Sequence, residues 1–188
     1  MMKCSLHQMD VKETFLNGVI EEEVYIEQPR GFEVEDRRTR VCKLKKDLYG
    51  MKKAPRDWYG RIYSSLTSLG FTKSKFDPNL HFKVMYDELV ILLLYVDDLF
   101  LTGNDKHIVE WKKKLAEEFE MKDLGLMHYF LGLEVWQSPK GIFLNQGKYA
   151  VEMLKRFDML DCKSMATPMD TNLNLLSNEL SKLMDVTR

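Results

Sequence analysis

The sequence has few cysteines and histidines, and they are widely spaced. Cys4, Cys42 and Cys162 form no C-x-x-C pair, and the four histidines show no H-x-x-x-H spacing. Structural zinc sites and disulfide-rich secreted folds depend on such clusters, so both are excluded. An odd number of cysteines without a framework favours a reducing compartment.

The sequence also lacks a long apolar run. Its longest run, residues 89–96, is far shorter than the roughly 20 residues of a membrane-spanning helix. The first ten residues contain no apolar core of a secretory signal. We therefore expect an intracellular protein that does not enter a membrane.

Net charge is nearly absent, because 28 Lys and Arg oppose 29 Asp and Glu. This balance excludes a small, uniformly basic nucleic-acid binder. The charge is nevertheless polarised: residues 37–61 carry ten basic side chains against only Asp47 and Asp57, a net charge of +8, and the rest of the chain carries −9. The basic segment predicts either a polyanion site or a solvated charged face.

The 45 % hydrophobic content is enough for a packed core. Hydrophobic periodicity and turn residues predict helices and short strands along most of the chain. Residues 54–69, 105–119 and 148–157 are predicted helices, and the predicted strands are 4–11, 24–26, 41–44, 80–85, 89–96, 99–101, 129–137 and 142–145. Residues 86–88 are predicted to form a turn and 170–188 a weakly apolar tail. The order strand, helix, strand, strand, helix, strand predicts an α+β fold with a ferredoxin-like split β-α-β core.

Asp97 and Asp98 stand directly after the longest apolar strand, at a hairpin between two apolar strands. An acidic turn explains such a pair, but so does a cation site, because buried adjacent charges need compensation. Asp10 ends the first predicted strand, which the split β-α-β order places beside this hairpin. Three such carboxylates can hold two Mg²⁺ ions about 3.5–4 Å apart, as in phosphoryl displacement.

Several sequence blocks carry a family resemblance. Y-V-D-D at 95–98 resembles the catalytic hairpin of reverse transcriptases. H-Q-M-D-V-K-E-T-F-L-N-G at 7–18, L-Y-G-M-K-K-A-P-R-D-W-Y at 48–59 and M-K-D-L-G-L-M-H-Y-F-L-G-L-E-V at 121–135 resemble polymerases of Ty1/copia-type retrotransposons. Further blocks at 22–32, 146–150 and 166–169 extend the match from residue 6 to about 170.

The resemblance implies an RNA-directed DNA polymerase that adds deoxynucleotides to a primer 3′-hydroxyl on an RNA or DNA template, using two Mg²⁺ or Mn²⁺ ions. It assigns catalysis to Asp10, Asp97 and Asp98, with the Val11 backbone carbonyl as a further metal ligand. Nucleotide binding is assigned to Phe15, Tyr49, Gly50, Lys52, Lys53 and Arg56. Phe15 falls where the family excludes a ribose 2′-hydroxyl.

The resemblance also assigns residues to the primer and to proton transfer. Tyr95, Phe130, Leu131 and Gly132 are implied at the primer terminus, and Lys122 is the candidate general acid for the leaving pyrophosphate. One departure is the pair Glu13–Thr14, where the family commonly has Thr-Ala; the extra carboxylate either disturbs the metal site or faces solvent.

The implied architecture is a polymerase palm with partial fingers at residues 1–145, followed by the start of a thumb or connection at 146–188. The resemblance implies protease, integrase and RNase H as partners in a Pol polyprotein, and a location in cytoplasmic virus-like particles or the nucleus. Two other hypotheses stay open: an inactive remnant that folds as a palm, and a palm-like binding module.

Overall fold

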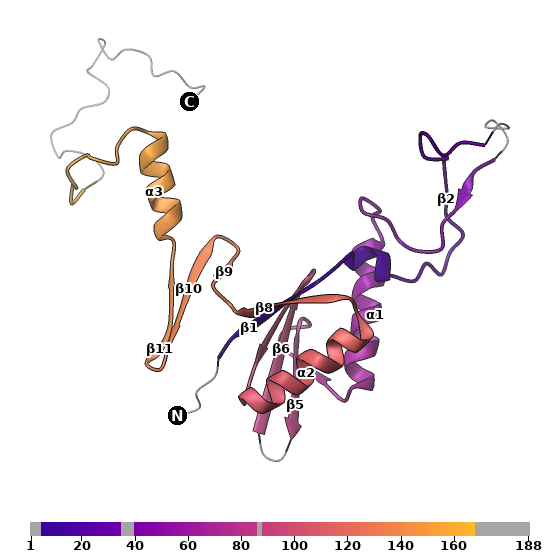
Figure 1. Cartoon of the computed structure of the whole chain (residues 1–188), viewed down its shortest axis with the longest axis horizontal. Helices are drawn as coiled ribbons and strands as arrows, with labels where there is room; N and C mark the ends of the chain where they lie inside the picture. The colour runs from indigo at the N-terminus through magenta and orange to yellow at the C-terminus, as the bar shows by residue number, and fades with distance from the viewer. Residues whose placement is uncertain (1–4, 35–39, 86–87, 168–188) are drawn as a thin grey trace, which may run out of the picture. The chain divides into compact units, whose positions relative to one another are not determined.

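A computed structural model describes residues 5–34, 40–85 and 88–167 (Figure 1). The chain divides into two compact units, Met1–Asn145 and Gln146–Arg188. The tail predicted at 170–188, residues 86 and 87 of the predicted turn, and Arg37 and Arg38 of the basic segment lie outside the described residues.

Six antiparallel strands form the central sheet of the first unit, in the order β4-β5-β6-β7-β1-β8. They are β1 (His7–Val11), β4 (Thr72–Lys73), β5 (Leu80–Met85), β6 (Glu88–Tyr95), β7 (Asp98–Thr102) and β8 (Met121–Leu126). The inner order β6-β7-β1-β8, with one helix before β6 and one after β7, is that of a split β-α-β core. Helices and antiparallel sheets agree with the predicted α+β class.

Helices α1 (Ala54–Ser68) and α2 (Asp105–Glu118) cover one face of this sheet (Figure 1). Pro55 suits the first turn of α1, and the Asn104 side chain caps α2 by accepting a hydrogen bond from the Lys106 amide. The main core joins the two helices to alternate strand residues: Met9, Val11, Trp58, Ile62, Leu66, Val90, Leu92, Leu94, Leu99, Leu101, Ile108, Trp111 and Leu115. Among the described residues of this unit, no helix packs against the opposite face of the sheet.

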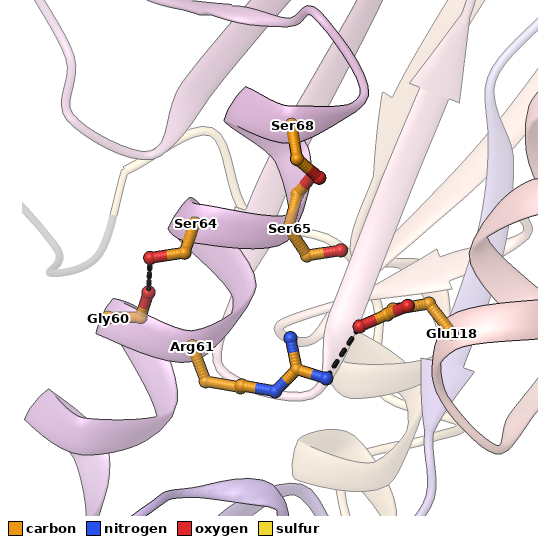
Figure 2. A network of polar contacts seen from close by, with 6 residues as sticks. All are labelled: Gly60, Arg61, Ser64, Ser65, Ser68 and Glu118. Carbon is orange, nitrogen blue, oxygen red and sulfur yellow. Dashed lines mark hydrogen bonds and ion pairs between the residues drawn. The ribbon is translucent and has the colours of Figure 1, made fainter.

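A polar contact fixes the two helices to each other. Figure 2 shows Arg61 reaching from α1 to Glu118 of α2, with Nη2 of Arg61 2.5 Å from Oε1 of Glu118. The guanidinium also lies 5.1 Å from the ring centre of Phe119. On the same stretch of α1, the Ser64 hydroxyl donates to the Gly60 carbonyl within the helix (Figure 2).

The apolar residues of β6 explain why the hairpin is firmly placed. Val90, Leu92 and Leu94 are buried against the helices, as expected for a core strand. Leu89, Ile91 and Leu93 on the other face are only half-buried, so the prediction of burial on both faces holds for one face alone. A small cluster around Phe100, Met127 and Val135 covers part of this second face.

The fourth strand of the core was predicted in the wrong place. The structure puts β8 beside β1, whereas the sequence pattern pointed to 129–137. No residue of Met121–Leu126 is fully buried, so no apolar alternation reveals β8.

The strand predicted at 129–137 is in fact two strands of a separate sheet ordered β11-β10-β9. These are β9 (Tyr129–Phe130), β10 (Leu133–Ser138) and β11 (Gly141–Asn145). Leu131 and Gly132 have φ of 48° and 83°, which reverses the chain in a two-residue turn. Gln137 joins this sheet to the N-terminal segment, because its Oε1 accepts from the Leu6 amide and its Nε2 donates to the Leu6 carbonyl.

The remaining elements are short. They are the 3₁₀ helix η1 (Thr14–Asn17), strands β2 (Tyr25–Ile26) and β3 (Cys42–Lys43), and helix α3 (Gly147–Arg156) in the second unit. Within the described ranges, no helix combines the length and apolarity needed to cross a membrane.

Candidate active site

The β6–β7 hairpin carries the Asp pair on a two-residue turn. Tyr95 and Asp98 are paired across the strands, which leaves Val96 and Asp97 as the loop. Val96 has φ of 54°, a left-handed conformation that two-residue hairpins require and that β-branched residues rarely adopt. The turn therefore stores backbone strain at the residue before Asp97.

Strand β1 lies directly beside this hairpin, as the predicted order requires. Asp10 is the cross-strand partner of Asp98, and the Val11 amide donates a 2.8 Å hydrogen bond to the Asp97 carbonyl. Directly opposed residues point to the same face of a sheet. Asp10 and Asp98 thus share the face that α1 and α2 leave uncovered, and exposed Asp97 lies at its rim.

Asp98 is affected both by its burial and by the two neighbouring carboxylates. Burial raises the pKa of Asp98 above its ordinary value, a hydrogen bond from Gln8 opposes that rise, and the negative charges of Asp97 and Asp10 add to it. The Gln8 Nε2 donates to Asp98 Oδ1 at 2.7 Å. Uncompensated carboxylates of this kind favour a cation.

Lys122 lies on the other side of Asp10. The two are cross-strand partners between β1 and β8, so Asp98, Asp10 and Lys122 form a row over three adjacent strands on one face. The Lys122 side chain is exposed. The strand register thus puts a lysine next to Asp10 on the face that carries Asp98, which the sequence motif alone could not show.

The segment after β1 is held by Thr14. The Thr14 side chain is buried, and its hydroxyl donates to the Val11 carbonyl at 2.8 Å. Glu13 has φ of 49° and an exposed side chain. Of the two alternatives for this departure, the structure places Glu13 toward solvent.

Three of the six residues assigned to nucleotide binding line cavities, and they line two different ones. Phe15 lines a cavity of about 260 Å³ together with Pro55, Trp58, Tyr59, Asn79, Leu94, Tyr95 and Val96. Tyr49 packs edge-on against Phe15 with ring centres 4.9 Å apart, and Gly50 has φ of 90°, which favours glycine.

Lys53 and Arg56 instead line a larger cavity of about 540 Å³ between α1 and residues 19–24. Lys53 pairs with Glu22 at 2.6 Å, and Lys52 is exposed nearby. The structure therefore does not bring these cations into the cavity that holds Phe15.

Two of the residues assigned to the primer, Tyr95 and Phe130, belong to a row of three aromatic rings. Tyr95 packs edge-on against Phe130 at 5.4 Å, and Phe130 against Phe100 at 4.6 Å. Leu131 and Gly132 form the turn directly after Phe130. The contact between Tyr95 and Phe130 connects the β6–β7 hairpin, which carries the Asp pair, to the β9–β10 turn.

The donor set suits a hard divalent cation in kind, because it consists of carboxylate oxygens and a backbone carbonyl. Among the residues that the structure describes, however, no three His, Cys, Asp or Glu side chains form a ready-made metal cluster.

Two residues beside the Asp pair were not singled out as functional by the sequence. Trp58 was expected only as a core residue of α1, yet its indole Nε1 donates to the Val96 carbonyl at 2.7 Å. The sequence motif gives Gln8 no role, although a polar residue two positions before Asp10 on a strand points to the same face. That spacing is a signal that could have found it.

Comparisons with known proteins identify the family and several relatives of the chain. Residues 2–171 match the family described as reverse transcriptase (RNA-dependent DNA polymerase). The chain is 42 % identical over 174 residues to the retrovirus-related Pol polyprotein from transposon TNT 1-94 of Nicotiana tabacum, covering 90 % of this chain and 13 % of that protein. It is 39 % identical over 186 residues to the corresponding polyprotein from transposon RE2 of Arabidopsis thaliana, covering 97 % and 13 %.

A third relative is the putative transposon Ty5-1 protein of Saccharomyces cerevisiae, 32 % identical over 181 residues, with 95 % of this chain and 59 % of that protein covered. The chain thus spans about an eighth of the two plant polyproteins. No solved structure matches the chain significantly.

Proposed function

The chain belongs to the reverse transcriptase (RNA-dependent DNA polymerase) family of copia-type transposon Pol proteins, and we propose that Asp10, Asp97 and Asp98 form the polymerase centre of its palm. The observation that carries the proposal is the pairing of Asp10 with Asp98 across β1 and β7, beside the turn that holds Asp97. Residues far apart in the sequence thereby share one uncovered face of the sheet.

Asp10 and Asp97 would hold Mg²⁺, supported by Asp98 and the Val11 carbonyl; when bound, the ions lower the pKa of the primer hydroxyl and stabilise charge on the leaving pyrophosphate. The pKa of Asp98 is raised mainly by burial and further by the charges of Asp97 and Asp10, and a bound cation would relieve both effects. Lys122, opposite Asp10, would donate a proton or a hydrogen bond to a departing phosphate oxygen.

The neighbouring aromatic residues would position the substrates. Phe15 lines the cavity next to Tyr95 and Val96, where it would pack against the sugar of an incoming deoxynucleotide. The packed rings of Tyr95 and Phe130 would support the primer end. Protease, integrase and RNase H would be parts of the parent polyprotein, in cytoplasmic virus-like particles or in the nucleus.

Primer extension on poly(rA)/oligo(dT) with Mg²⁺ tests the proposal. We expect Asp97→Asn to reduce the rate about 1,000-fold or more, since it removes a ligand that acts on the transition state. Asp161→Asn, an exposed carboxylate in the second unit, is the matched control and should retain activity. Equal activity of Asp97→Asn and wild type would refute the assignment.

An inactive remnant is a second candidate, favoured by the lack of a ready-made three-ligand cluster in the described part of the chain. It predicts no extension by folded wild-type protein and no binding of Mn²⁺. Titration with Mn²⁺, followed by electron paramagnetic resonance, separates it from the polymerase proposal.

A further inference from the structure

The Val96–Asp97 turn needs external support to keep its conformation. Val96 adopts φ of 54° although its side chain is β-branched, and it is 49 % exposed, so its own side chain contributes little packing. Strained backbone persists only where the surroundings over-determine it. The contacts to the turn must therefore hold it in place.

Two consecutive carbonyls of the turn are bonded from two different elements. The Val96 carbonyl accepts from the Trp58 indole on α1 at 2.7 Å, and the Asp97 carbonyl accepts from the Val11 amide on β1 at 2.8 Å. The β1 bond continues the backbone pairing between β1 and β7. The α1 bond comes from a side chain and is specific to residue 58.

Trp58 is itself rigidly placed. Only 2 % of the residue is exposed, and its ring packs edge-on against Phe119 with centres 5.4 Å apart. Arg61, three residues further along α1, also pairs with Glu118 of α2 (Figure 2). The hydrogen bond therefore connects the turn to the core of the molecule.

We propose that Trp58 is a positioning residue: its indole N–H holds the Val96–Asp97 turn in the strained conformation that keeps Asp97 beside Asp10. The inference deepens the polymerase assignment and rests on it for its catalytic meaning. The same ring lines the cavity that contains Phe15, so one side chain supports both the carboxylate turn and that cavity.

The chain offers a matched control for this contact. Trp111 is also a buried tryptophan of the main core, 1 % exposed, but its Nε1 has no hydrogen-bond partner among the described residues. Trp58→Phe and Trp111→Phe both remove an indole from the core, and only the first removes a bond to the turn. Comparing them separates positioning from general packing.

The first measurement is hydrogen exchange of the Val11 amide by nuclear magnetic resonance, because this N–H bonds to Asp97. Relative to Trp111→Phe, we expect Trp58→Phe to accelerate Val11 exchange about tenfold or more by local opening. The Met9 amide, on the same strand away from the turn, should change equally in both variants. Equal Val11 rates in the two variants would overturn the proposal.

The second measurement is Mn²⁺ affinity, which should fall about fivefold or more in Trp58→Phe and less than twofold in Trp111→Phe, because misplacement of a ligand weakens coordination. Adding Val96→Asn to Trp58→Phe should restore both slow exchange of the Val11 amide and the Mn²⁺ affinity. Asn tolerates the left-handed conformation without the hydrogen bond from Trp58. A failure of this rescue would also contradict the role of strain.

The two proposals fail in different ways. Absence of Mn²⁺ binding in wild type would refute the polymerase assignment, whereas the Val11 exchange rates would still decide the role of Trp58. Should Trp58→Phe unfold, placing benzothienylalanine at position 58 alone removes the N–H while keeping the ring shape, with the same expected acceleration.

Discussion

Gln8 holds Asp98 through a 2.7 Å hydrogen bond between neighbouring strands on the uncovered face of the sheet. Hydrogen bonds to a charged group contribute about 1.5–3 kcal/mol to stability. We expect Gln8→Met to lower the free energy of unfolding at pH 7 by about 1–2 kcal/mol, measured in urea. In a double-mutant cycle with Asp98→Ala, the effect of Gln8→Met should largely disappear. A full effect in the absence of Asp98 would show that Gln8 acts through packing.

His81 predicts a loss of stability in mild acid. Burial lowers the pKa of this fully buried histidine, against the opposing effect of a hydrogen bond to the Asn79 carbonyl. The unfolded chain, with a histidine pKa near 6.5, then binds a proton that the folded chain resists. The free energy of unfolding should therefore fall as the pH drops below about 6.5.

The matched variants for this prediction are His81→Phe and His128→Phe. His81→Phe should weaken the stability loss between pH 7 and 5, while replacement of the exposed His128 should leave it unchanged. In both variants the free energy of unfolding should still fall somewhat with decreasing pH, because burial also lowers the pKa of His7. An identical pH profile for His81→Phe and wild type would contradict the assignment.

Replacing Gly103 and replacing Gly60 by alanine should change the stability of the protein in opposite directions. A Cβ at Gly103 would lie 2.9 Å from the Leu89 carbonyl oxygen, and φ of 154° is unfavourable for other residues. We expect Gly103→Ala to destabilise the protein by about 2–3 kcal/mol. Gly60, on the exposed side of α1, has nothing within 4 Å of a Cβ, so Gly60→Ala should stabilise by about 0.5–1 kcal/mol. Thermal unfolding of both variants tests the signs.

The basic segment predicts salt-dependent binding of primer-template. Arg56→Ala should reduce the slope of log Kd against log salt by about one if its guanidinium contacts a phosphate. Lys53→Ala should have a smaller effect, because Glu22 already neutralises this ammonium. Fluorescence anisotropy with an RNA–DNA hybrid measures both, with the exposed Lys106→Ala on α2 as control. If the slope of log Kd against log salt were unchanged in Arg56→Ala, the basic segment would instead be a solvated charged face.

The sequence predicted those parts of the fold that bury apolar side chains. The helical spacing of Trp58, Ile62 and Leu66 placed α1, and the continuous apolar run placed β6. Strand β8 was missed because its contacts are mainly backbone pairing with β1, which leaves no periodic mark. Hydrophobic periodicity in the sequence indicates which side chains are buried, but it indicates only indirectly which strands pair.

The candidate site was predictable to the level of strand order. That order placed Asp10 near the hairpin, but the register that opposes it to Asp98 and to Lys122 depends on the whole sheet. The bond from Trp58 to a backbone carbonyl leaves no trace in residue type, because a buried tryptophan at helical spacing predicts a core position equally well.

The one-sided cover of the central sheet bears on how a substrate reaches the carboxylates. Within the described residues of the Met1–Asn145 unit, both long helices lie behind the sheet, while Asp97 and Lys122 face solvent at its front. Under the proposed polymerase function, a template-primer would reach this row from the side, without being threaded through an opening. Its affinity would then depend on contacts on either side of the row.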